Sequence, residues 1–519
     1  MMLKRLKNTA LLLTATSLPF TLFSSQLPAA TAADTAGALK AAVNQHIADH
    51  GGEILGDFRE LLAMPNVSTS LPDMQKNAQW ISRYIGERGF SSRIVRAGGA
   101  PYILAERKTP GATRTVLIYA HFDGQPVEPA DWKTPPFEPT LKDAAATLDW
   151  EKALKQGIDP EWRVYARSAG DDKAPVIALM HAIDAMDAAG LEASVNVKLI
   201  LDGEEEFGSP TVEQILEEHA DELSADILLF CDGPMHQSGL RQLVFGVRGD
   251  IGVNLTLYGP SRPLHSGHYG NWAPHPTDAL MRLLATMKDM DGNIQVAGYL
   301  DEVTPVSEAE QVAIAAIPSV DAQLQDELAL GRVEGAGERI EMTIMRPAIN
   351  IVGFQAGGVD DQARNIILSK ARASLDLRLV PAQTIDHVKQ TLEEHFKSQG
   401  FYVTYEEPSE EVLRNNPGVI KVDWTEGYPA YRSDLNGEAA RKLTAILTKY
   451  DGEKPLISPT LGGSLPIHLF DQALDMPIVL LPIANHDNNQ HGRDENMRVG
   501  NLFSAIGVYA AVLEGFGRN

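Results

Sequence analysis

The segment VNVKLILDGEEEFG, residues 195–208, determines both the expected fold and the expected site. Its first seven residues form an apolar run of strand length, rich in branched side chains, which favours a buried β-strand. Glu204, Glu205 and Glu206 follow. Open α/β sheets bind their ligands at the carboxyl ends of the strands. Three acids there repel one another and lose hydration, so we expect a bound cation to compensate them. A solvated charged loop is the competing interpretation, and the other acids and histidines decide between the two.

Composition limits the class of protein. A chain of 519 residues is too long for one ordinary core, so we expect two or three domains. The formal net charge of −24 and the absence of a basic stripe argue against a nucleic-acid partner. Cys231 is the single cysteine, which excludes an internal disulfide and a thiolate zinc cluster.

The N-terminus has the pattern of a secretory signal peptide. Residues 1–7 are basic, residues 10–23 are mostly apolar, and residues 30–32 are small, as at a cleavage site. The apolar part is shorter than the ~20 residues of a membrane-spanning helix, and no later segment is long and apolar enough. We therefore expect no membrane partner. Export without disulfides favours a bacterial periplasmic location.

Alternating strands and helices predict an α/β catalytic domain, a mixed sheet flanked by helices. Near Arg248 the pattern changes to that of an inserted α+β unit, after which the α/β pattern resumes; the family resemblance described below implies that this unit is a lid and dimerisation domain. The family resemblance described below further implies that the insertion 142–160 and the lid stretch 303–340 border the site. The expected organisation is a signal peptide at 1–33, catalytic domain at 34–246, inserted domain at 247–410 and catalytic domain again at 411–519.

The candidate ligands share one position, because each follows a predicted strand or begins a helix at the same edge of the sheet. They are His121, Asp123, Asp171, Asp172, Glu205, Glu206, Asp232, His486 and His491. Each alone has an ordinary explanation as a core histidine, a helix cap or a turn-former. Their recurrence at successive loops favours a divalent metal site. Imidazoles together with carboxylates suit zinc, manganese or cobalt better than calcium. Two ions ~3.5–4 Å apart need a bridging carboxylate, and a spare carboxylate can act as base.

The order of these residues resembles that of a known family. The pattern is His121-x-Asp123, Asp171-Asp172-Lys173, Glu205-Glu206, Asp232, His265-Ser-Gly and His491. It is similar to the co-catalytic metallopeptidase family of carnosinases, bacterial dipeptidases, glutamate carboxypeptidases, aminoacylases and deacetylating amidohydrolases. The resemblance covers nearly the whole chain after the leader. The segment Gly462-Gly-Ser-Leu-Pro466, the segment Arg378-Leu-Val-Pro381 and the long lid look most like the nonspecific dipeptidase and carnosinase branch.

The resemblance implies two divalent ions per subunit, Zn²⁺ in the first place, with Mn²⁺ or Co²⁺ as alternatives. His121 and Asp232 would hold one ion, Glu206 and His491 the other, and Asp171 would bridge them. His486 competes with His491 for this role. We prefer His491, because the family's histidine is followed four residues later by a glutamate, here Glu495.

The resemblance also implies the catalytic groups. Asp123 would orient the imidazole of His121, and Glu205 would be the general base, taking a proton from a bridging water and passing it to the leaving amine. His265 would reach across a homodimer, formed through the inserted domain, and help to stabilise the tetrahedral oxyanion. The residues that would bind the substrate's carboxylate and backbone are Arg378, Ser464 and Asn365.

The sequence departs from the family pattern at two positions that flank Asp171-Asp172-Lys173. The segment Ala166-Arg167-Ser168 replaces the usual Gly-Arg-Gly, and Ala174 follows Lys173 where glycine is usual. These changes concern the shape of the loop more than metal binding.

The sequence therefore predicts an enzyme that hydrolyses the amide bond of dipeptides or very short peptides with two metal ions. An N-acyl-amino-acid amidohydrolase is the alternative within enzymes, because the same attack serves any amide. A solute-binding protein that has lost catalysis is the alternative from another class. That class should lack a ligand or the base, whereas the five ligands and Glu205 are all present. Side-chain specificity and the native metal stay open at this stage.

Overall fold

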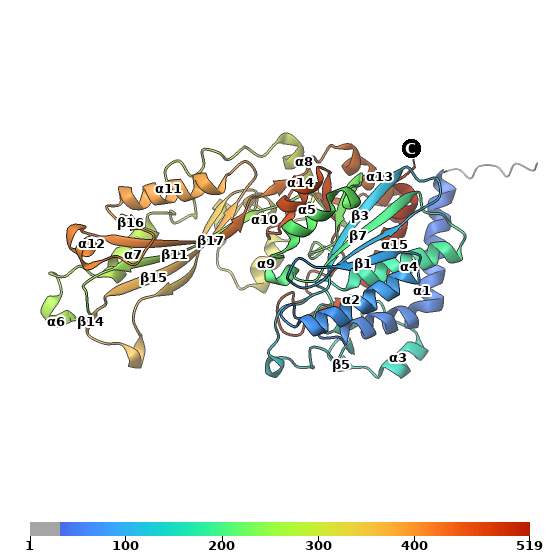
Figure 1. The fold of residues 1–519 in the computed structure, drawn as a ribbon, viewed down its shortest axis with the longest axis horizontal. Helices are drawn as coiled ribbons and strands as arrows, with labels where there is room; N and C mark the ends of the chain where they lie inside the picture. Colours follow the sequence, from blue (N-terminus) through green and yellow to red (C-terminus); the bar gives the residue numbers. More distant parts are fainter. Residues whose placement is uncertain (1–31, 519) are drawn as a thin grey trace, which may run out of the picture.

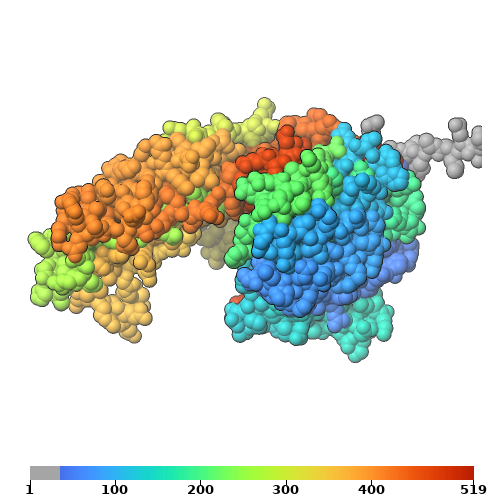
Figure 2. All heavy atoms as spheres, viewed as in Figure 1, coloured from blue at the N-terminus to red at the C-terminus, as the bar shows by residue number. Residues whose placement is uncertain are grey.

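The computed structural model describes residues 32–518, which form two lobes of different architecture (Figure 1). The larger lobe contains the N-terminal helices and the C-terminus, and the smaller lobe projects from it. In the space-filling view the lobes stay distinct, with open space between their lower parts (Figure 2). The predicted leader, 1–33, lies outside the described residues except for its last two positions, which begin α1 (Ala32–Leu62).

The larger lobe is built on a mixed sheet, as the sequence predicts, and the structure shows that this sheet has eight strands. In spatial order its strands are β1 (Ser91–Val95), β2 (Tyr102–Arg107), β7 (Val195–Asp202), β3 (Arg114–His121), β8 (Ile227–Phe230), β20 (Ile478–Leu480), β9 (Gln242–Val244) and β19 (Leu456–Ser458). The central strands β7, β3, β8 and β20 are parallel, whereas β1, β2 and β9 run antiparallel to their neighbours toward the centre. The central strands are buried on both faces, which explains their nearly continuous apolar runs.

Helices cover both faces of this sheet. On one face lie α1, α2 (Leu71–Gly86), α4 (Ala174–Ala188), α13 (Glu438–Asp451) and α15 (Val499–Gly515). On the other face lie α5 (Val212–Leu223) and α14 (Ile467–Leu474). The helices α4 and α15 pack against each other beneath the sheet and are buried around most of their circumference. Of the described residues, no helix is long and apolar enough to cross a membrane.

The parallel strands bring their carboxyl ends to one edge of the sheet. His121 ends β3, residues 203–206 follow β7, and Asp232 comes two residues after β8. A small four-stranded sheet lies beside this edge and consists of β21 (Asn496–Arg498), β6 (Arg163–Tyr165), β4 (Thr140–Asp143) and β5 (Ala146–Thr147). It joins the insertion at 142–160, which includes α3 (Trp150–Gln156), to the chain that follows His491.

The smaller lobe is a five-stranded sheet with helices on one face. Its strands, in spatial order, are β13 (Ala348–Gln355), β15 (Lys370–Leu379), β11 (Gly249–Tyr258), β17 (Val419–Tyr428) and β16 (Tyr402–Thr404). The helices α7 (Pro276–Ala285) and α11 (Ile385–Ser398) cover one face and bury its apolar residues. At the far tip are β12 (Leu264–His265), α6 (Ser266–Tyr269) and β14 (Ile366–Ile367) (Figure 1). The expected lid segment, 303–340, contains α8 (Glu308–Ala316) and α9 (Asp321–Glu327), and α10 (Ile340–Thr343) begins at its end.

The sheet of the smaller lobe corrects one expected boundary. We placed the end of the inserted domain at residue 410, but β17 pairs along its length with β11, so the inserted unit continues to Tyr428. The apolar–polar alternation of residues 419–425, VIKVDWT, is the signal for this strand. The chain crosses between the lobes at β10 (Gly246–Val247) and β18 (Tyr431–Arg432), which pair with each other.

Gly203 connects β7 to the acidic segment, and other parts of the chain pack closely against its backbone. A Cβ added there would collide with the Pro101 carbonyl oxygen and lie 2.9 Å from Phe122 Cζ. We expect Gly203→Ala to destabilise the protein by about 1–3 kcal/mol, because the backbone must move to relieve this overlap. Urea unfolding measures the change.

The matched control is Gly56→Ala in the middle of α1, where a Cβ would meet nothing within 4 Å. It should leave stability unchanged or raise it by about 0.5–1 kcal/mol. Equal unfolding midpoints for the Gly203→Ala variant and the wild type would contradict the close packing at Gly203.

Candidate metal centre

The first group of ligand candidates lies at the ends of β3 and β8. His121 Nε2 is 2.7 Å from Asp171 Oδ1 and 4.0 Å from Asp232 Oδ2. All three side chains are buried, and their ligand atoms lie within 4.8 Å of one another. One imidazole and two carboxylates at this spacing have the composition of a site for a divalent ion.

A second group shares Asp171 with the first. His491 Nε2 lies 3.2 Å from Asp171 Oδ2 and 3.1 Å from Glu206 Oε2. Each oxygen of Asp171 therefore faces a different imidazole, which is the arrangement of a carboxylate that bridges two ions. The competitor His486 is exposed and belongs to neither group.

Asp123 connects His121 to the segment that carries Glu205. Its Oδ1 lies 3.3 Å from His121 Nδ1, on the side of the ring that faces away from Asp171. The same carboxylate accepts hydrogen bonds from the backbone nitrogens of Glu205 at 3.0 Å and Glu206 at 3.1 Å. One buried side chain thus orients the imidazole and fixes the turn that presents both glutamates.

Glu495 holds the loop that carries Asp171. Its carboxylate accepts hydrogen bonds from the backbone nitrogens of Ser168, Gly170 and Asp171 at 2.9–3.0 Å, and from Arg167 Nη1 at 2.7 Å. Glu495 is fully buried, and burial raises its pKa to about 7. At the sequence level it served only to distinguish His491 from His486, so its structural role was missed.

The three acids of the opening segment separate into two roles. Glu205 and Glu206 face the metal-ligand candidates, whereas Glu204 points away from them and is buried. Glu204 accepts hydrogen bonds from the backbone nitrogens of Ala100 at 2.8 Å and Thr211 at 3.0 Å. The expectation that one cation compensates all three acids is therefore wrong for Glu204, which hydrogen-bond donors of the protein satisfy.

The remaining charges favour a positive ion at the centre. Burial and the neighbouring acids raise the pKa of Glu205 well above its usual range, and burial raises that of Asp232 to about 7. Hydrogen bonds with Asp171 and Glu206 raise the pKa of His491 to about 10. Acids that resist ionisation and an imidazole that retains its proton are the signs of uncompensated negative charge.

The donor atoms fit metal ions. Glu206 Oε1 is buried and lacks a hydrogen-bond donor among the described residues, and the buried Asp171 Oδ2 faces the His491 ring. No lysine or arginine of residues 32–518 forms an ion pair with Asp171, Glu205, Glu206 or Asp232, so histidines are their only cationic contacts there. Two imidazoles and several carboxylates suit a zinc, manganese or cobalt ion at each group.

The predicted substrate-binding residues fall into two places. Arg378 Nη1 donates to Ser464 Oγ at 2.8 Å where the lobes meet, and Arg378 also contacts Asp376 at 3.1 Å. Asn365 lies elsewhere, at the tip of the smaller lobe. Its carbonyl oxygen accepts a hydrogen bond from the backbone nitrogen of Ser266, directly after His265.

His265 is exposed at that tip, far along the smaller lobe from the metal-ligand candidates (Figure 1). Its ring nitrogen Nδ1 accepts a hydrogen bond from the Gly267 backbone nitrogen, and its ring packs beside that of His268. Within one chain, His265 and Asn365 therefore do not join the metal-ligand candidates.

Two polar residues near the centre were not predicted. Gln125 Nε2 donates to Glu206 Oε2 at 2.8 Å, and Asn66 Nδ2 donates to Phe122 O and Ser168 Oγ, both at 2.8 Å. Gln125 follows His121 by four residues, so its place after β3 was a usable signal. Asn66 comes from the segment after α1 and had none.

The fold and the paired ligand groups define a metal-dependent hydrolase with an α/β catalytic lobe. Residues 117–515 match the family described as Peptidase family M20/M25/M40. The chain belongs to this peptidase family, and the predicted recognition and enzyme class are confirmed.

Relatives with assigned activities match across most of the chain. The Cys-Gly metallodipeptidase dug1 of Schizosaccharomyces pombe is 26% identical over 421 residues, covering 79% of this chain and 81% of the relative. The Beta-Ala-His dipeptidase of Homo sapiens is 26% identical over 425 residues, covering 79% and 76%.

Solved structures share the fold. The M20 family metallo-carboxypeptidase Sso-CP2 from Sulfolobus solfataricus superposes with a TM-score of 0.73 at 25% identity, covering 90% of this chain and 99% of that one. Human carnosine dipeptidase 1 gives a TM-score of 0.72 at 22% identity, covering 92% and 99%. The predicted fold class is therefore confirmed.

The hydrogen bonds to Glu495 lead to a prediction. Glu495→Gln replaces one acceptor oxygen by an amide donor that would face backbone N–H groups, so the Asp171 loop should lose its fixed position. We expect metal affinity to fall by about 10–100-fold. Competition with a chromophoric chelator measures this affinity.

Glu161→Gln is the control, because Glu161 is an exposed acid whose ion pair with Arg498 lies outside the centre. It should leave metal affinity unchanged. A Glu495→Gln protein with wild-type affinity would show that the loop holds its shape without this carboxylate.

Proposed function

We propose that the protein is a dinuclear metal-dependent dipeptidase that hydrolyses the amide bond of dipeptides or very short peptides. The observation that carries this proposal is the pair of ligand groups that share Asp171, with Glu205 beside them. The chain belongs to a peptidase family, and relatives in it are named as a metallodipeptidase and a metallo-carboxypeptidase. Because relatives of this chain are named as dipeptidases, short peptides are a better-supported substrate class for it than N-acyl amino acids.

The proposed assignments follow the two groups. His121 and Asp232 would hold one ion, Glu206 and His491 the other, and Asp171 both. When bound, two divalent ions polarise the substrate carbonyl and lower the pKa of the attacking water. The ions are proposed to be Zn²⁺, with Mn²⁺ or Co²⁺ as alternatives.

Glu205 is the proposed general base. Its Oε2 lies 3.9 Å from His121 Nε2, so the carboxylate borders the first ligand group, although it is a member of neither group. Glu205 would accept the proton of the attacking water and deliver it to the amine that leaves.

Arg378 is the proposed partner of the substrate's terminal carboxylate. Its guanidinium is part-buried and hydrogen-bonded to Ser464, and Asp376 and Asp250 on its other side hold its orientation. Planar guanidinium groups bind carboxylates through two parallel hydrogen bonds. A carboxylate bound at a fixed distance from the metals would limit substrates to short chains.

The test is hydrolysis of a dipeptide panel beside matched N-acetyl amino acids, with chelated protein reloaded with zinc or manganese. Chelation should abolish activity, reloading should restore it, and free-amine dipeptides should be the better substrates. Preference for N-acetyl substrates would replace this proposal by the amidohydrolase. If the metal-loaded protein hydrolyses neither panel, the remaining interpretation is a solute-binding protein without catalytic activity.

Glu205→Gln tests the base within the same experiment. The amide cannot accept a proton, so kcat should fall by about 10²–10⁴-fold. The metal content, measured by mass spectrometry, should be that of the wild type. Loss of an ion in this variant would move Glu205 into the ligand set.

We also propose a homodimer formed through the smaller lobe. The strand β13 lies at the edge of its sheet, and no other strand of residues 32–518 pairs with its outer side. Three large apolar side chains on β13 are exposed: Ile351 by 53%, Val352 by 64% and Phe354 by 46%. Apolar side chains along an edge strand suit contact with a second copy of the same surface. In such a dimer the tip with His265 and Asn365 would serve the other subunit's centre.

Complementation tests this arrangement. Glu205→Gln and His265→Ala homodimers should each be nearly inactive, but a mixed dimer has one centre with both residues intact. After subunit exchange, an equal mixture should regain about a quarter of wild-type activity, since half of the dimers are mixed. No recovery, with exchange verified by native mass spectrometry, would mean that His265 does not act across subunits.

A further inference from the structure

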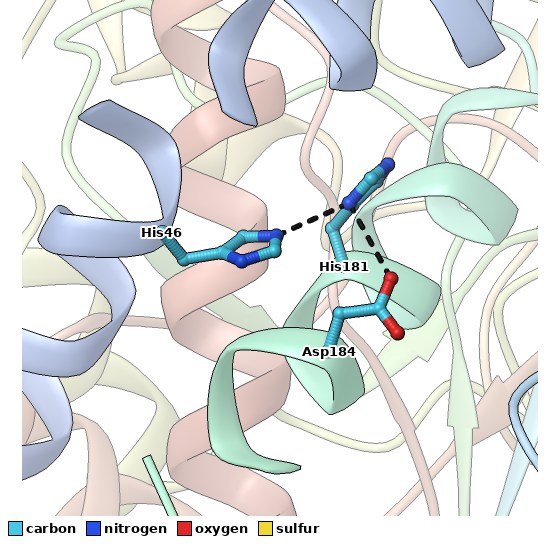
Figure 3. Close-up of side chains that lie close together, drawn as sticks. All are labelled: His46, His181 and Asp184. Atoms are coloured by element: carbon cyan, nitrogen blue, oxygen red, sulfur yellow. Dashed lines mark hydrogen bonds and ion pairs between the residues drawn. The ribbon is translucent and has the colours of Figure 1, made fainter. Parts of the chain in front are cut away.

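A second cluster of histidines and carboxylates lies between α1 and α4, outside the proposed peptidase centre (Figure 3). His46 comes from α1, and His181 and Asp184 come from successive turns of α4. His46 Nε2 lies 3.2 Å from His181 Nδ1, and His181 Nδ1 lies 3.6 Å from Asp184 Oδ2. The three ligand atoms lie within 4.8 Å of one another.

The other nitrogen of His181 faces groups that fix its tautomer. Nε2 lies 3.2 Å from Asp57 Oδ2 and 3.2 Å from the Tyr84 hydroxyl, which itself donates to Asp57 at 2.8 Å. The hydroxyl proton is used by Asp57, so the carboxylate is the acceptor for an N–H at Nε2. The lone pair of the His181 ring is then at Nδ1, directed at His46 and Asp184.

We propose that His46, His181 and Asp184 bind a divalent cation of the zinc class at a site separate from the peptidase centre. This proposal does not depend on the proposed function. Zinc bonds of about 2.0–2.1 Å with tetrahedral angles place ligand atoms about 3.3 Å apart. The separations of 3.2 and 3.6 Å around His181 Nδ1 have this size.

The surrounding side chains support a bound cation. Metal-binding histidines usually donate their second ring N–H to a carboxylate, as His181 does to Asp57. His46 is 8% exposed and His181 1%, so both rings are largely shielded from water.

The local charge also suits a divalent ion. Asp57, Asp184 and Glu53 are negative, and Arg88, whose Nε donates to Asp184 Oδ2 at 2.8 Å, is positive. Three negative charges and one positive charge leave a surplus of two negative charges. The oxygen that accepts from Arg88, Asp184 Oδ2, is also the one that faces His181 Nδ1, and a carboxylate oxygen has two lone pairs, so it can accept this hydrogen bond and still offer a lone pair to the ion.

An ion at this position would connect the two helices that support the catalytic loop. The helix α4 begins directly after Lys173, whose Nζ donates to the carbonyl oxygens of Leu61 at 2.9 Å and Met64 at 3.1 Å at the end of α1. The proposed ion would join α1 and α4 again, near the other end of α4. Its expected role is therefore structural, and its signature is metal-dependent stability.

The test uses His46→Gln in the full chain. A glutamine amide can still donate a hydrogen bond to His181 Nδ1, but it is a poor zinc ligand. After equilibrium dialysis against micromolar ZnCl₂, mass spectrometry should find one zinc ion more per chain in the wild type than in His46→Gln. The control is His219→Gln, a histidine on α5 that belongs to no ligand group, and it should keep the wild-type content.

Crystals soaked in ZnCl₂ provide a second measurement. Anomalous scattering at the zinc edge should place a peak between His46 Nε2, His181 Nδ1 and Asp184. Equal zinc content in the wild type and His46→Gln, or a peak that requires millimolar zinc, would overturn the proposal. The histidine pair would then be a hydrogen bond between two helices. Because the readout is metal content, a catalytically inactive protein that still shows the extra ion separates this result from failure of the peptidase proposal.

Discussion

The carboxylate of Glu495 is the interaction on which the candidate metal centre depends. Four donors of residues 167–171 converge on it from a loop more than 300 positions earlier in the chain. His491 lies four residues before Glu495, so the same short segment carries one ligand candidate and fixes the position of another. The centre is therefore assembled by contact between two loops that are distant in sequence.

A second carboxylate has the matching role on the other side. Asp123 orients His121 and accepts hydrogen bonds from the turn that presents Glu205 and Glu206. Two buried acids, Asp123 and Glu495, thus fix the positions of the acids and imidazoles that face the centre. Such support is costly in a buried setting unless donors satisfy each oxygen, and backbone N–H groups supply most of them here.

The sequence predicted the parts of the structure that follow from periodicity and strand order. Parallel strands bring their carboxyl ends to one edge, so His121, Glu206 and Asp232 were expected together, and the fold places them at that edge. The direction in which an individual side chain points could not be predicted in this way. Glu204 could not be separated from Glu205 and Glu206 by pattern, because the turn after Asp202 decides which acid faces the ligand candidates.

Tertiary contacts outside the pattern were also invisible. The His46–His181 pair depends on how α1 packs against α4, and Asn66 depends on how the segment after α1 meets the loops at Phe122 and Ser168; neither spacing nor composition encodes these contacts. The end of the inserted domain was misplaced because β17 comes after an irregular segment and a short helix, α12 (Glu410–Asn415), and its pairing with the distant strand β11 leaves no local signal in the sequence. The placement of His265 beside Asn365, in turn, follows from the pairing of β12 with β14.

The single cysteine lies in an informative position. Cys231 is fully buried between the end of β8 and Asp232, and burial raises the pKa of its thiol. Thiol reagents need an accessible thiolate, so they can reach it only when the central strands separate. The rate at which this thiol becomes labelled therefore reports how often the sheet opens beside a proposed metal ligand. The natural sequence thus contains one chemical probe of local unfolding, with no second thiol to confuse its signal.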